Sequence, residues 1–573
     1  MNILGIHDGH NASAALLVDG RIVACVQEER FRNEKNYMGF PDNAISWVLE
    51  AARVDYEDLD LVAAASVHQP QAFDVRKTRD VFRKEQEQFV RSRILLIGRN
   101  TPLYEIYRWR VKGERIRTFE KAGLTKRRTR FVEHHLCHAA AAYFGSPWRD
   151  RVLVLTLDGG GDKLAATVSI GSGSSLERIA VTPDADSIGN IYSRVTFLLG
   201  FVPWEHEYKI MGMAPYASEA HSARLEKELQ SYIALSQKNP LVFKRSIPEP
   251  TRLTCPRLRA SFQFERFDHI AGALQRFTEA SIVRWVREAV SKTGIRKIAL
   301  AGGVFMNVKA NKAIAEMPEV EDVFVFPSCG DESNAVGAAY WAYAEATGKA
   351  PDPIGPIYWG PDYASSDTED MVRAAARDGS FEYEEIKEIE DAVADLLIEQ
   401  KIVARLAGRM EFGARALGNR TILADPRNLI NVQVINRMIK MRDFWMPFAP
   451  VVLAESQDKY LRRTKPIRSP YMMFAFDTQP SRRPDIIAAV HQADGTARPQ
   501  VIEREYNPAY YDILFRFQKS TGRGALLNTS FNLHGYPIAL GPREALWVFK
   551  NSGLEYLALG HYLLHKKHVV SDT

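Results

Sequence analysis

The chain has 573 residues, enough for two to four domains with a large buried core. Its apolar fraction of 46%, charged fraction of 25% and formal net charge of +5 are those of an ordinary globular protein and do not by themselves indicate nucleic acid. Four cysteines lie far apart and form no CxxC pair, which argues against disulfides and zinc knuckles. Since no apolar segment is long enough to cross a bilayer, we expect a cytoplasmic protein.

The first 27 residues predict strands joined by tight turns. Residues 2–18 alternate strand, polar turn and strand, and Asp19 and Gly20 offer a hairpin turn before a strand over residues 21–27. His10, in the polar turn, is a candidate general base for a substrate hydroxyl, although a turn histidine bonded to local backbone is an equally good interpretation. Residues 152–170 repeat this layout, which predicts a duplicated half whose two turns clamp a nucleotide phosphate.

Charged helices follow the first strands. Residues 43–53 predict a helix, and residues 78–117 predict charged helices inserted at the surface. Basic residues gather between Arg76 and Arg130, but glutamates and aliphatic residues interleave them. This mixture favours a solvated helical face over a polyanion site.

A histidine pair in residues 132–162 predicts a metal site. His134 and His138 lie four residues apart in an Ala-rich stretch, so both imidazoles fall on one helix face, while His135 points elsewhere. A buried strand over residues 152–157 is expected to end in a turn from Asp158 to Asp162, whose carboxylates can hold a cation and whose amides can approach a phosphate. Alone, such a histidine pair is more often a surface pair, but the carboxylate that follows it favours a divalent metal.

Glycines and polar side chains follow two later strands. A strand over residues 297–301 leads into Gly302 and Gly303, which leave room for an adenosine over the backbone, with Asn307 placed to bond the ligand. A second strand, over residues 323–326, places Asp331 at another strand end, where α/β sheets carry functional loops. Earlier in the chain, Lys209 lies in residues 207–216, whose composition indicates a loop and a buried helix. Lys209 could contact a phosphate, although a solvated lysine is the better interpretation.

A Pro- and Gly-rich linker over residues 351–366 precedes a part of the chain in which cations replace carboxylates. These cations and amides lie beside glycines or strand ends, at Arg415, Arg420, Lys440, Arg442, Arg498 and Asn528–Ser530. Each alone is more often a surface residue, but together they favour a shared site for a phosphate or carboxylate ligand.

Eight motifs in order resemble the O-carbamoyltransferases of antibiotic and nodulation-factor biosynthesis, the NodU/CmcH family, over nearly the whole chain. They are HDGHNASAALL, VEHHLCHAAAAYF, TLDGGGD, YKIMGMAPY, GGVFMNVKAN, CGDESNAVGAA, EFGARALGNRTILADPR and NTSFN. Two small departures are Ala414, where the family usually has proline, and Met446, where arginine is common.

The resemblance implies an α/β fold with two domains. Residues 1–350 would form an actin/Hsp70-like, Kae1-like pair of lobes, and residues 367–573 a YrdC-like domain. It also implies that carbamoyl phosphate and ATP, the latter with Mg²⁺, give carbamoyl-adenylate in the C-terminal domain. The N-terminal domain would then pass the carbamoyl group to a hydroxyl of a sugar or natural product.

The resemblance further implies residue roles. The metal set would be His134, His138, Asp158 and Asp331, holding Fe(II). His10 would be the general base, with Lys440 and Ser530 catalytic in adenylation. Nucleotide and carbamoyl phosphate would be bound by Asp162, Lys209, Gly302, Gly303, Asn307, Arg415, Arg420, Lys440, Arg442, Arg498, Asn528 and Ser530.

Two other functions remain open at this point. A tRNA threonylcarbamoyl-type enzyme would use the basic residues between Arg76 and Arg130, but such enzymes usually keep the two domains as separate proteins. A non-catalytic actin-like nucleotide switch would leave the cation-rich C-terminal part without a purpose. No membrane or nucleic-acid partner is expected, and a homodimer is the most common assembly for a chain of this kind.

Overall fold

The computed structural model describes residues 1–68, 75–87, 102–124 and 128–566. For residues 102–108 it describes the backbone alone. Two compact units make up the chain. The first comprises Met1–Glu29 and Asn36–Ile354, and the second comprises Gly355–Thr573 together with Arg30–Lys35. Sequence analysis did not anticipate that an early segment belongs with the C-terminal unit.

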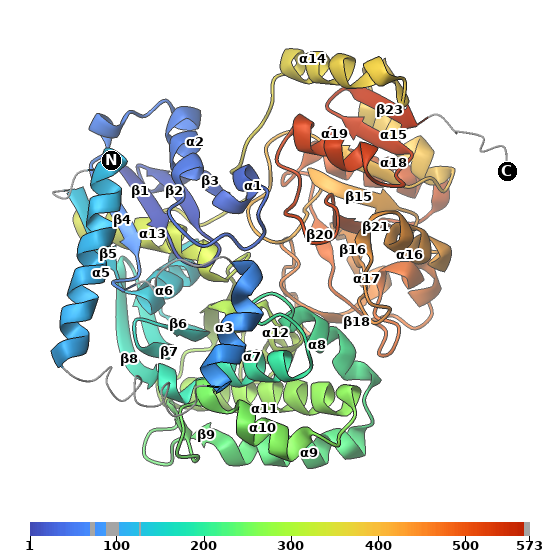
Figure 1. The fold of residues 1–573 in the computed structure, drawn as a ribbon. Coiled ribbons are helices and arrows are strands. Elements are labelled where there is room, and N and C mark those ends of the chain that lie inside the picture. The colour runs from blue at the N-terminus through green and yellow to red at the C-terminus, as the bar shows by residue number, and fades with distance from the viewer. Residues whose placement is uncertain (69–74, 88–101, 125–127, 567–573) are drawn as a thin grey trace. The chain divides into compact units, whose positions relative to one another are not determined.

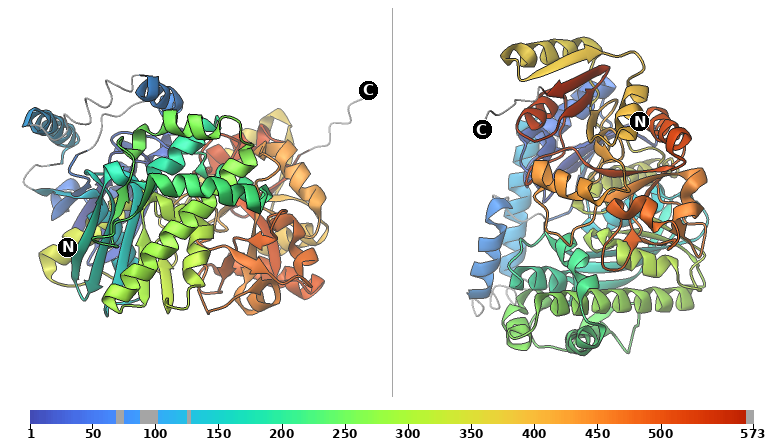
Figure 2. Two further views of the ribbon diagram at one scale, coloured as in Figure 1. Left: turned by 90° about the horizontal axis from the view of Figure 1, so that it is seen from below. Right: turned by 90° about the vertical axis from the view of Figure 1, so that its right-hand side faces the viewer.

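The first unit contains the same five-stranded sheet twice (Figures 1 and 2). In the first sheet, β1 pairs antiparallel with β2, β2 with β3, and β1 pairs parallel with β4, which pairs parallel with β5. In the second, β6, β7, β8, β11 and β12 repeat this order and these directions. The predicted duplication and the two-lobed α/β architecture are therefore confirmed. The strands are β1 Asn2–His7, β2 Ser13–Val18, β3 Arg21–Gln27, β4 Leu61–Ala65, β5 Thr129–Val132, β6 Val152–Gly161, β7 Leu164–Ser172, β8 Ser175–Pro183, β11 Lys297–Ala301 and β12 Asp322–Val325, with a separate hairpin of β9 Ile233–Leu235 and β10 Phe243–Arg245.

Helices α6 (His134–Gly145) and α13 (Asn334–Thr347) pack against each other, with α13 on the first sheet and α6 on the second. Close approach explains why a glycine lies at this crossing, because a Cβ on Gly337 would lie 1.9 Å from the carbonyl oxygen of Cys137. Helix α6 follows β5 of the first sheet and carries His134 and His138, whereas α13 follows β12 of the second sheet, just after the short turn that begins at Asp331. The other helices of this unit are α1 Glu28–Arg32, which runs into the second unit, α2 Asp42–Ala52, α3 Thr78–Glu87, α5 Pro102–Lys121, α7 Ile188–Leu198, α8 Glu207–Met213, α9 Glu219–Tyr232, α10 Cys255–Phe262, α11 Phe267–Thr293 and α12 Val308–Ala315.

One predicted turn was partly wrong. Strand β6 does not end at Leu157 but continues to Gly161, which pairs with Leu164 across a hairpin. The turn itself is formed by Asp162 and Lys163, both with positive φ. The glycines therefore extend the strand through an irregular register, which moves Asp158 from a turn into the strand.

The second unit is built on an eight-stranded mixed sheet in the order β13-β23-β22-β14-β15-β21-β16-β20. Its strands alternate between two apolar cores: Val403 and Leu423 face α15 and α18, whereas Ala404 and Ile422 face α14, α16 and α19. This is the two-faced burial that a sheet covered by helices on both sides requires. The strands are β13 Phe381–Glu385, β14 Val403–Leu406, β15 Arg420–Ala424, β16 Ala449–Leu453, β20 Gln500–Ile502, β21 Ala525–Ser530, β22 Tyr556–Leu559 and β23 Tyr562–Lys566, with a small sheet of β17 Leu461–Arg462, β18 Phe476–Thr478 and β19 Thr496–Ala497. The helices are α14 Ser365–Ala375, α15 Ile389–Ile398, α16 Leu429–Ile435, α17 Gln457–Tyr460, α18 Pro508–Thr521 and α19 Pro542–Lys550, and one π-helical turn spans Asn436–Lys440.

Among the described helices, none has both the length and the apolar character needed to cross a membrane. The charged helices predicted over residues 78–117 are present as α3 and α5, although residues 88–101, and Lys126 and Arg127 of the basic stretch, lie outside the described residues. Within α5, the prediction of a solvated face fails for Arg115, whose exposed fraction is 8%. Its guanidinium binds Asp8 and the carbonyl oxygens that end β4.

Candidate functional site

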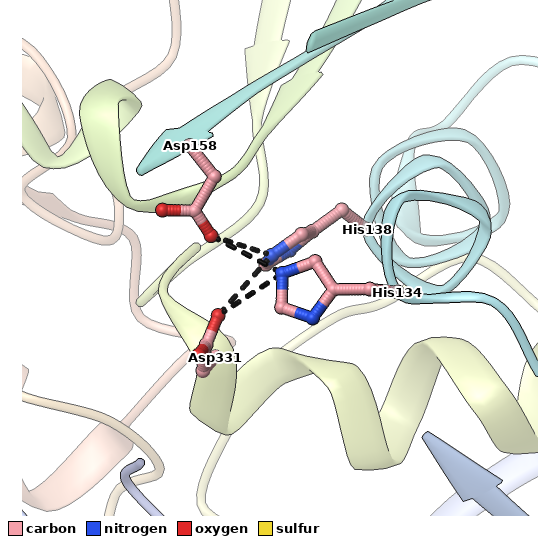
Figure 3. Close-up of side chains that lie close together, drawn as sticks. All are labelled: His134, His138, Asp158 and Asp331. Carbon is pink, nitrogen blue, oxygen red and sulfur yellow. Dashed lines mark hydrogen bonds and ion pairs between the residues drawn. The ribbon is translucent and has the colours of Figure 1, made fainter. Parts of the chain in front are cut away.

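Two histidines and two aspartates from three parts of the first unit meet at one point (Figure 3). The Nε2 atoms of His134 and His138 each lie 3.3 Å from Asp158 Oδ2 and 3.4 Å from Asp331 Oδ1. Both imidazoles are buried, and both carboxylates are partly exposed. The structure therefore brings together the four residues that the resemblance implied as a metal set.

Local structure explains how each ligand is placed. Glu133 caps α6 by accepting hydrogen bonds from the backbone N–H groups of His135 and Leu136, so the helix starts at His134 and puts His134 and His138 on one face. Asp158 lies near the end of β6, and Asp331 follows β12 in a short helical turn. All four ligands thus come from regular elements rather than long loops, which holds them in place.

A lack of side-chain bulk at Gly161 makes room for the first imidazole. A Cβ on Gly161 would lie 2.2 Å from Cγ of His134, far inside van der Waals contact. The glycines that follow Asp158 were expected to admit a phosphate. Here one of them makes space for a metal-ligand side chain instead.

A hydrogen bond on the far side of His134 sets its ring orientation. Ser66 Oγ lies 3.0 Å from His134 Nδ1, which leaves Nε2 facing the carboxylates. A partner on the outer nitrogen is the usual way in which a metal-binding histidine is oriented. Ser66 carried no sequence signal of its own, because it follows β4 and meets His134 only in the folded sheet.

Asp162, expected at the nucleotide, serves a structural purpose in this structure. Its carboxylate accepts hydrogen bonds from the backbone N–H groups of Val67, His68 and His134, at 2.8 to 2.9 Å. It therefore joins the β6–β7 turn to the loop after β4 and to the start of α6. A carboxylate that already accepts hydrogen bonds from three backbone N–H groups is poorly suited to a nucleotide site as well.

The carboxylates of Asp158 and Asp331 strongly favour positive charge on the two histidines. Burial alone would lower the pKa of His134, but the carboxylates of Asp331 and Asp158 outweigh it and raise that pKa to about 10. The pKa of His138 is also raised, by hydrogen bonds to the same two carboxylates against the effect of burial. Conversely, burial would raise the pKa values of Asp158 and Asp331, but the two histidines hold both below the usual range. A divalent cation bound at this point would neutralise the carboxylates in place of the protons on the imidazoles.

The donor set fits a divalent transition metal. Two imidazole nitrogens and two carboxylate oxygens lie within 4.8 Å of one another, each residue offering one atom. Mixed nitrogen and oxygen ligands of this kind suit iron, manganese, cobalt or zinc. The cluster is therefore a possible metal-binding site.

His7 was missed by the sequence analysis. It is fully buried at the end of β1, its Nε2 lies 3.9 Å from Asp331 Oδ2, and the same nitrogen is 3.0 Å from the carbonyl oxygen of His10. Burial lowers the pKa of His7 to about 4, so this imidazole is neutral. Its place at the end of the first strand, three residues before His10, was the signal that could have indicated it.

His10 follows in the turn after β1, where it contacts an aromatic ring. Its ring contacts Trp204 in a T-shaped arrangement with centroids 5.8 Å apart. Burial lowers the pKa of His10 below its ordinary value, although Asp331 and Asp158 act in the opposite direction. A neutral imidazole at neutral pH can accept a proton. The backbone carbonyl oxygen of His10 contacts His7 Nε2, which lies 3.9 Å from Asp331 Oδ2.

The glycines after β11 support the same cluster. Gly302 has a φ of 107°, and a Cβ there would lie 2.4 Å from the carbonyl oxygen of Leu157. A Cβ on Gly303 would lie 3.2 Å from Asp158 Oδ1. These two glycines therefore let the β11 turn pass close to the end of β6, and the space they leave lies beside a metal-ligand carboxylate.

Two other residues expected at the nucleotide have contacts of their own. Asn307 caps α12, accepting from the Ala310 N–H, and exchanges amide hydrogen bonds of 2.9 Å with Gln275. Lys209 Nζ lies over the Phe201 ring, 5.7 Å from its centroid. Neither contact places these residues at the histidine–aspartate cluster.

A buried lysine of the second unit donates several hydrogen bonds to the segment after β21. Lys440, 3% exposed, donates to Asn532 Oδ1 at 2.7 Å, to Ser530 Oγ at 3.2 Å and to the backbone carbonyl oxygens of Ser530 and Asn532. Burial lowers its pKa, and the neighbouring cations Arg442 and Lys35 lower that pKa further. Lys440 and Ser530, predicted as a catalytic pair, are thus in direct contact, and Asn532 is a third member that sequence analysis did not single out.

Three arginines extend this positive region. Arg442 donates to Thr529 Oγ1 at 3.2 Å, next to Ser530 on β21, and stacks over Phe448. Burial lowers the pKa of Arg498, and the like charges of Arg415 and Arg442 lower it further. Arg498 Nε is buried and has no hydrogen-bond partner among the described residues. A group of cations of this kind is a possible anion-binding site.

Arg420 and Asn528 are not available to a ligand in this structure. Arg420 is fully buried and donates to the carbonyl oxygens of Pro361, Ala407, Gly408, Asn419 and Leu540. The side chain of Asn528 bonds Thr421 Oγ1 and the carbonyl oxygen of Ala416. The expectation that both bind the anion is corrected: they hold the loops around the site.

Comparisons with known proteins cover both units. A carbamoyltransferase N-terminus family model matches residues 2–340, and a carbamoyltransferase C-terminus model matches residues 394–566. Nodulation protein NolNO of Sinorhizobium fredii is 31% identical over 561 residues, which are 97% of this chain and 79% of that protein. Nodulation protein NolO of Bradyrhizobium diazoefficiens is 31% identical over 439 residues, 76% of this chain and 79% of that protein.

Among solved structures, full-length HypF in its phosphate- and nucleotide-bound form matches with a TM-score of 0.35 and 14% identity, over 60% of this chain and 46% of that chain. Component A of (R)-2-hydroxyglutaryl-CoA dehydratase from Acidaminococcus fermentans matches with a TM-score of 0.32 and 18% identity, over 60% of this chain and 99% of that chain.

Proposed function

This chain belongs to the carbamoyltransferase family, and from that membership we propose an ATP-dependent O-carbamoyltransferase that works in two steps. In the second unit, carbamoyl phosphate, ATP and water give carbamoyl-adenylate, pyrophosphate and phosphate. In the first unit, a hydroxyl of a sugar or natural product attacks the carbamoyl carbon, and AMP leaves. The main support is the cluster of Lys440, Arg415, Arg442 and Arg498, which lies within the part of the chain that the carbamoyltransferase C-terminus model matches.

The first step requires groups that neutralise phosphates. Lys440 and Ser530 lie in contact at the end of β21, and Arg442 lies beside Thr529 on the same strand. In our proposal these groups bind the phosphates of ATP and carbamoyl phosphate and stabilise the charge on pyrophosphate as it leaves. Mg²⁺ would accompany ATP.

The second step requires a base and a site for the adenylate. His10 takes the proton of the acceptor hydroxyl while the new carbon–oxygen bond forms and the bond to AMP breaks. The adenylate would lie over Gly302 and Gly303, with Lys209 on its phosphate. His134, His138, Asp158 and Asp331 would hold Fe(II), which when bound polarises oxygens of the mixed anhydride. We further propose a cytoplasmic enzyme that acts as a homodimer.

One assay tests the proposal. The full chain is incubated with carbamoyl phosphate and ATP, pyrophosphate release is followed, and carbamoyl-adenylate is sought by mass spectrometry. We expect pyrophosphate only when both substrates are present. The His10→Asn variant should still release pyrophosphate but fail to carbamoylate any of a panel of sugars. No pyrophosphate from the unmodified chain would reject the function, and loss of both steps in His10→Asn would reject the role of His10.

A further inference from the structure

The loop before α8 holds a tryptophan in an uncommon backbone conformation. Trp204 has a φ of 65°, in the left-handed region that a bulky side chain rarely adopts. Its backbone N–H donates to Glu207 Oε1 at 2.8 Å, which fixes this conformation at the start of α8. A strained backbone that surrounding contacts maintain is typical of residues with a function.

The indole ring of Trp204 contacts two other rings of the first unit. Phe82 of α3 meets it with centroids 5.1 Å apart and ring planes at 80°, and His10 meets it at 5.8 Å and 61°. Phe82 is only 1% exposed, whereas Trp204 is 41% exposed. The indole is therefore supported by a buried ring and still accessible to a ligand beside His10.

Charged residues hold the supporting ring in place. The Arg194 guanidinium lies over Phe82, 3.9 Å from the ring centroid, and pairs with Glu85 at 2.9 Å, one helical turn further along α3. Arg252 pairs with the same carboxylate. Because Arg194 is 2% exposed, these contacts join α3 firmly to α7 and fix the ring on which the indole rests.

The backbone of His10 is fixed as well. It pairs with Met38 in an isolated β-bridge, and its carbonyl oxygen lies 3.0 Å from His7 Nε2. The imidazole is half-buried. Since both rings have set positions, a molecule that lies on the indole has its substituents beside the imidazole that we propose as the general base.

The chemistry of an indole face favours one class of ligand. Its negative charge density attracts the C–H groups on the face of a saturated ring, whereas the face of a phenol is itself negative and gains less from face-to-face stacking. We propose that Trp204 is the acceptor platform of the first unit. Its ligand is a hydroxylated saturated ring of the pyranose or cyclitol type, with one hydroxyl directed at His10. This inference deepens the proposed function and rests on it for the reaction at His10, but not for binding of the ring.

The test measures binding to the full chain by ligand-observed NMR with two panels of probes. One panel contains methyl pyranosides and cyclitols, and the other contains phenols and straight-chain alcohols. We expect at least one member of the first panel to bind, and its Kd to rise about tenfold in Trp204→Gly, because an aromatic contact is lost. Glycine is suitable here because it adopts a positive φ without strain.

Three further variants separate the aromatic face from general packing. Trp204→Leu keeps an apolar side chain against Phe82 but has no aromatic face, so it should weaken binding as Trp204→Gly does, even if the glycine variant does not fold. Trp204→Phe restores an aromatic face and should recover part of the affinity. Trp547→Ala removes a tryptophan of similar exposure, 39%, from the second unit and should bind as the unmodified chain does.

Several results would overturn the inference. These are binding of phenols or alcohols alone, binding of neither panel, and equal Kd values for the unmodified chain and Trp204→Leu. Pyrophosphate release from ATP and carbamoyl phosphate tests the proposed function separately. If the unmodified chain releases none but Trp204→Leu loses pyranoside binding, the function fails and the platform stands. If pyrophosphate is released while the Kd stays equal, the platform fails and the function stands.

Discussion

Arg115 forms a two-pronged ion pair with Asp8, with Nη2 2.6 Å from Oδ1 and Nε 2.8 Å from Oδ2. Their side chains are only 9% and 8% exposed. A helix of the charged insertion thus holds the polar turn that carries His10. Arg115 also donates to the carbonyl oxygens of Ala65 and Ser66, which ties the same turn to the strand end beside His134.

Replacing Arg115 should therefore destabilise the first unit. Arg115→Met removes a donor from Asp8 and from the carbonyl oxygens of Ala65, Ser66 and Val67, and removing one partner of a buried pair costs about 3 kcal/mol. We expect a lower midpoint of urea unfolding. Arg110→Met, on the same helix but with a side chain 79% exposed, is the control and should change stability by less than about 0.5 kcal/mol. Equal effects of the two substitutions would show that the pair with Asp8 contributes nothing.

Removing the hydroxyl of Ser66 should weaken metal binding while leaving the ligands in place. Ser66→Ala frees His134 Nδ1, so the imidazole loses the partner that turns Nε2 toward the carboxylates. Loss of such a partner typically lowers metal affinity by roughly 10 to 100-fold. Competition for Fe(II) with a chromophoric chelator measures the change. Ser46→Ala, which removes an exposed serine hydroxyl bonded to a helix carbonyl, should bind metal as the unmodified chain does.

Adding one methyl group at Gly161 should displace a ligand. Gly161→Ala would bring a Cβ to 2.2 Å from the His134 ring, so the ring or the strand has to move, at a cost of roughly 1 to 3 kcal/mol. We expect lower Fe(II) affinity together with reduced thermal stability. Gly113→Ala is the matched change, because its Cβ meets nothing within 4 Å and lies in helix α5, where alanine is favoured over glycine. Unaltered Fe(II) affinity in Gly161→Ala would contradict this view of the site.

Lys440→Met should abolish the first chemical step. The substitution removes the ammonium that contacts Ser530 and Asn532, and each charge-assisted hydrogen bond to a ligand contributes about 1.5 to 3 kcal/mol. We expect pyrophosphate release to fall by about 100-fold or more, and Ser530→Ala to lower it as well. Arg437→Met replaces an exposed cation three residues away and should retain activity. Normal release by Lys440→Met would remove this lysine from the mechanism.

Local sequence was sufficient for the histidine pair and for several of the strands and helices around it, and the resemblance completed the set of four metal ligands. The spacing of His134 and His138 follows from helix geometry, and Asp158 and Asp331 follow from the tendency of functional groups to gather at strand ends. Among the strands that the sequence predicted, β6 differs because its glycines let it continue past Leu157, where pairing with β7 decides its end.

Only the tertiary structure decided which polar side chains form hydrogen bonds within the protein itself. In the sequence, Asp162, Arg420 and Asn528 look like binding residues. In the structure, Asp162 accepts hydrogen bonds from backbone N–H groups, Arg420 donates to backbone carbonyl oxygens, and Asn528 accepts from the Thr421 hydroxyl. A short sequence window contains the donor or acceptor but not its partner, which comes from a distant segment.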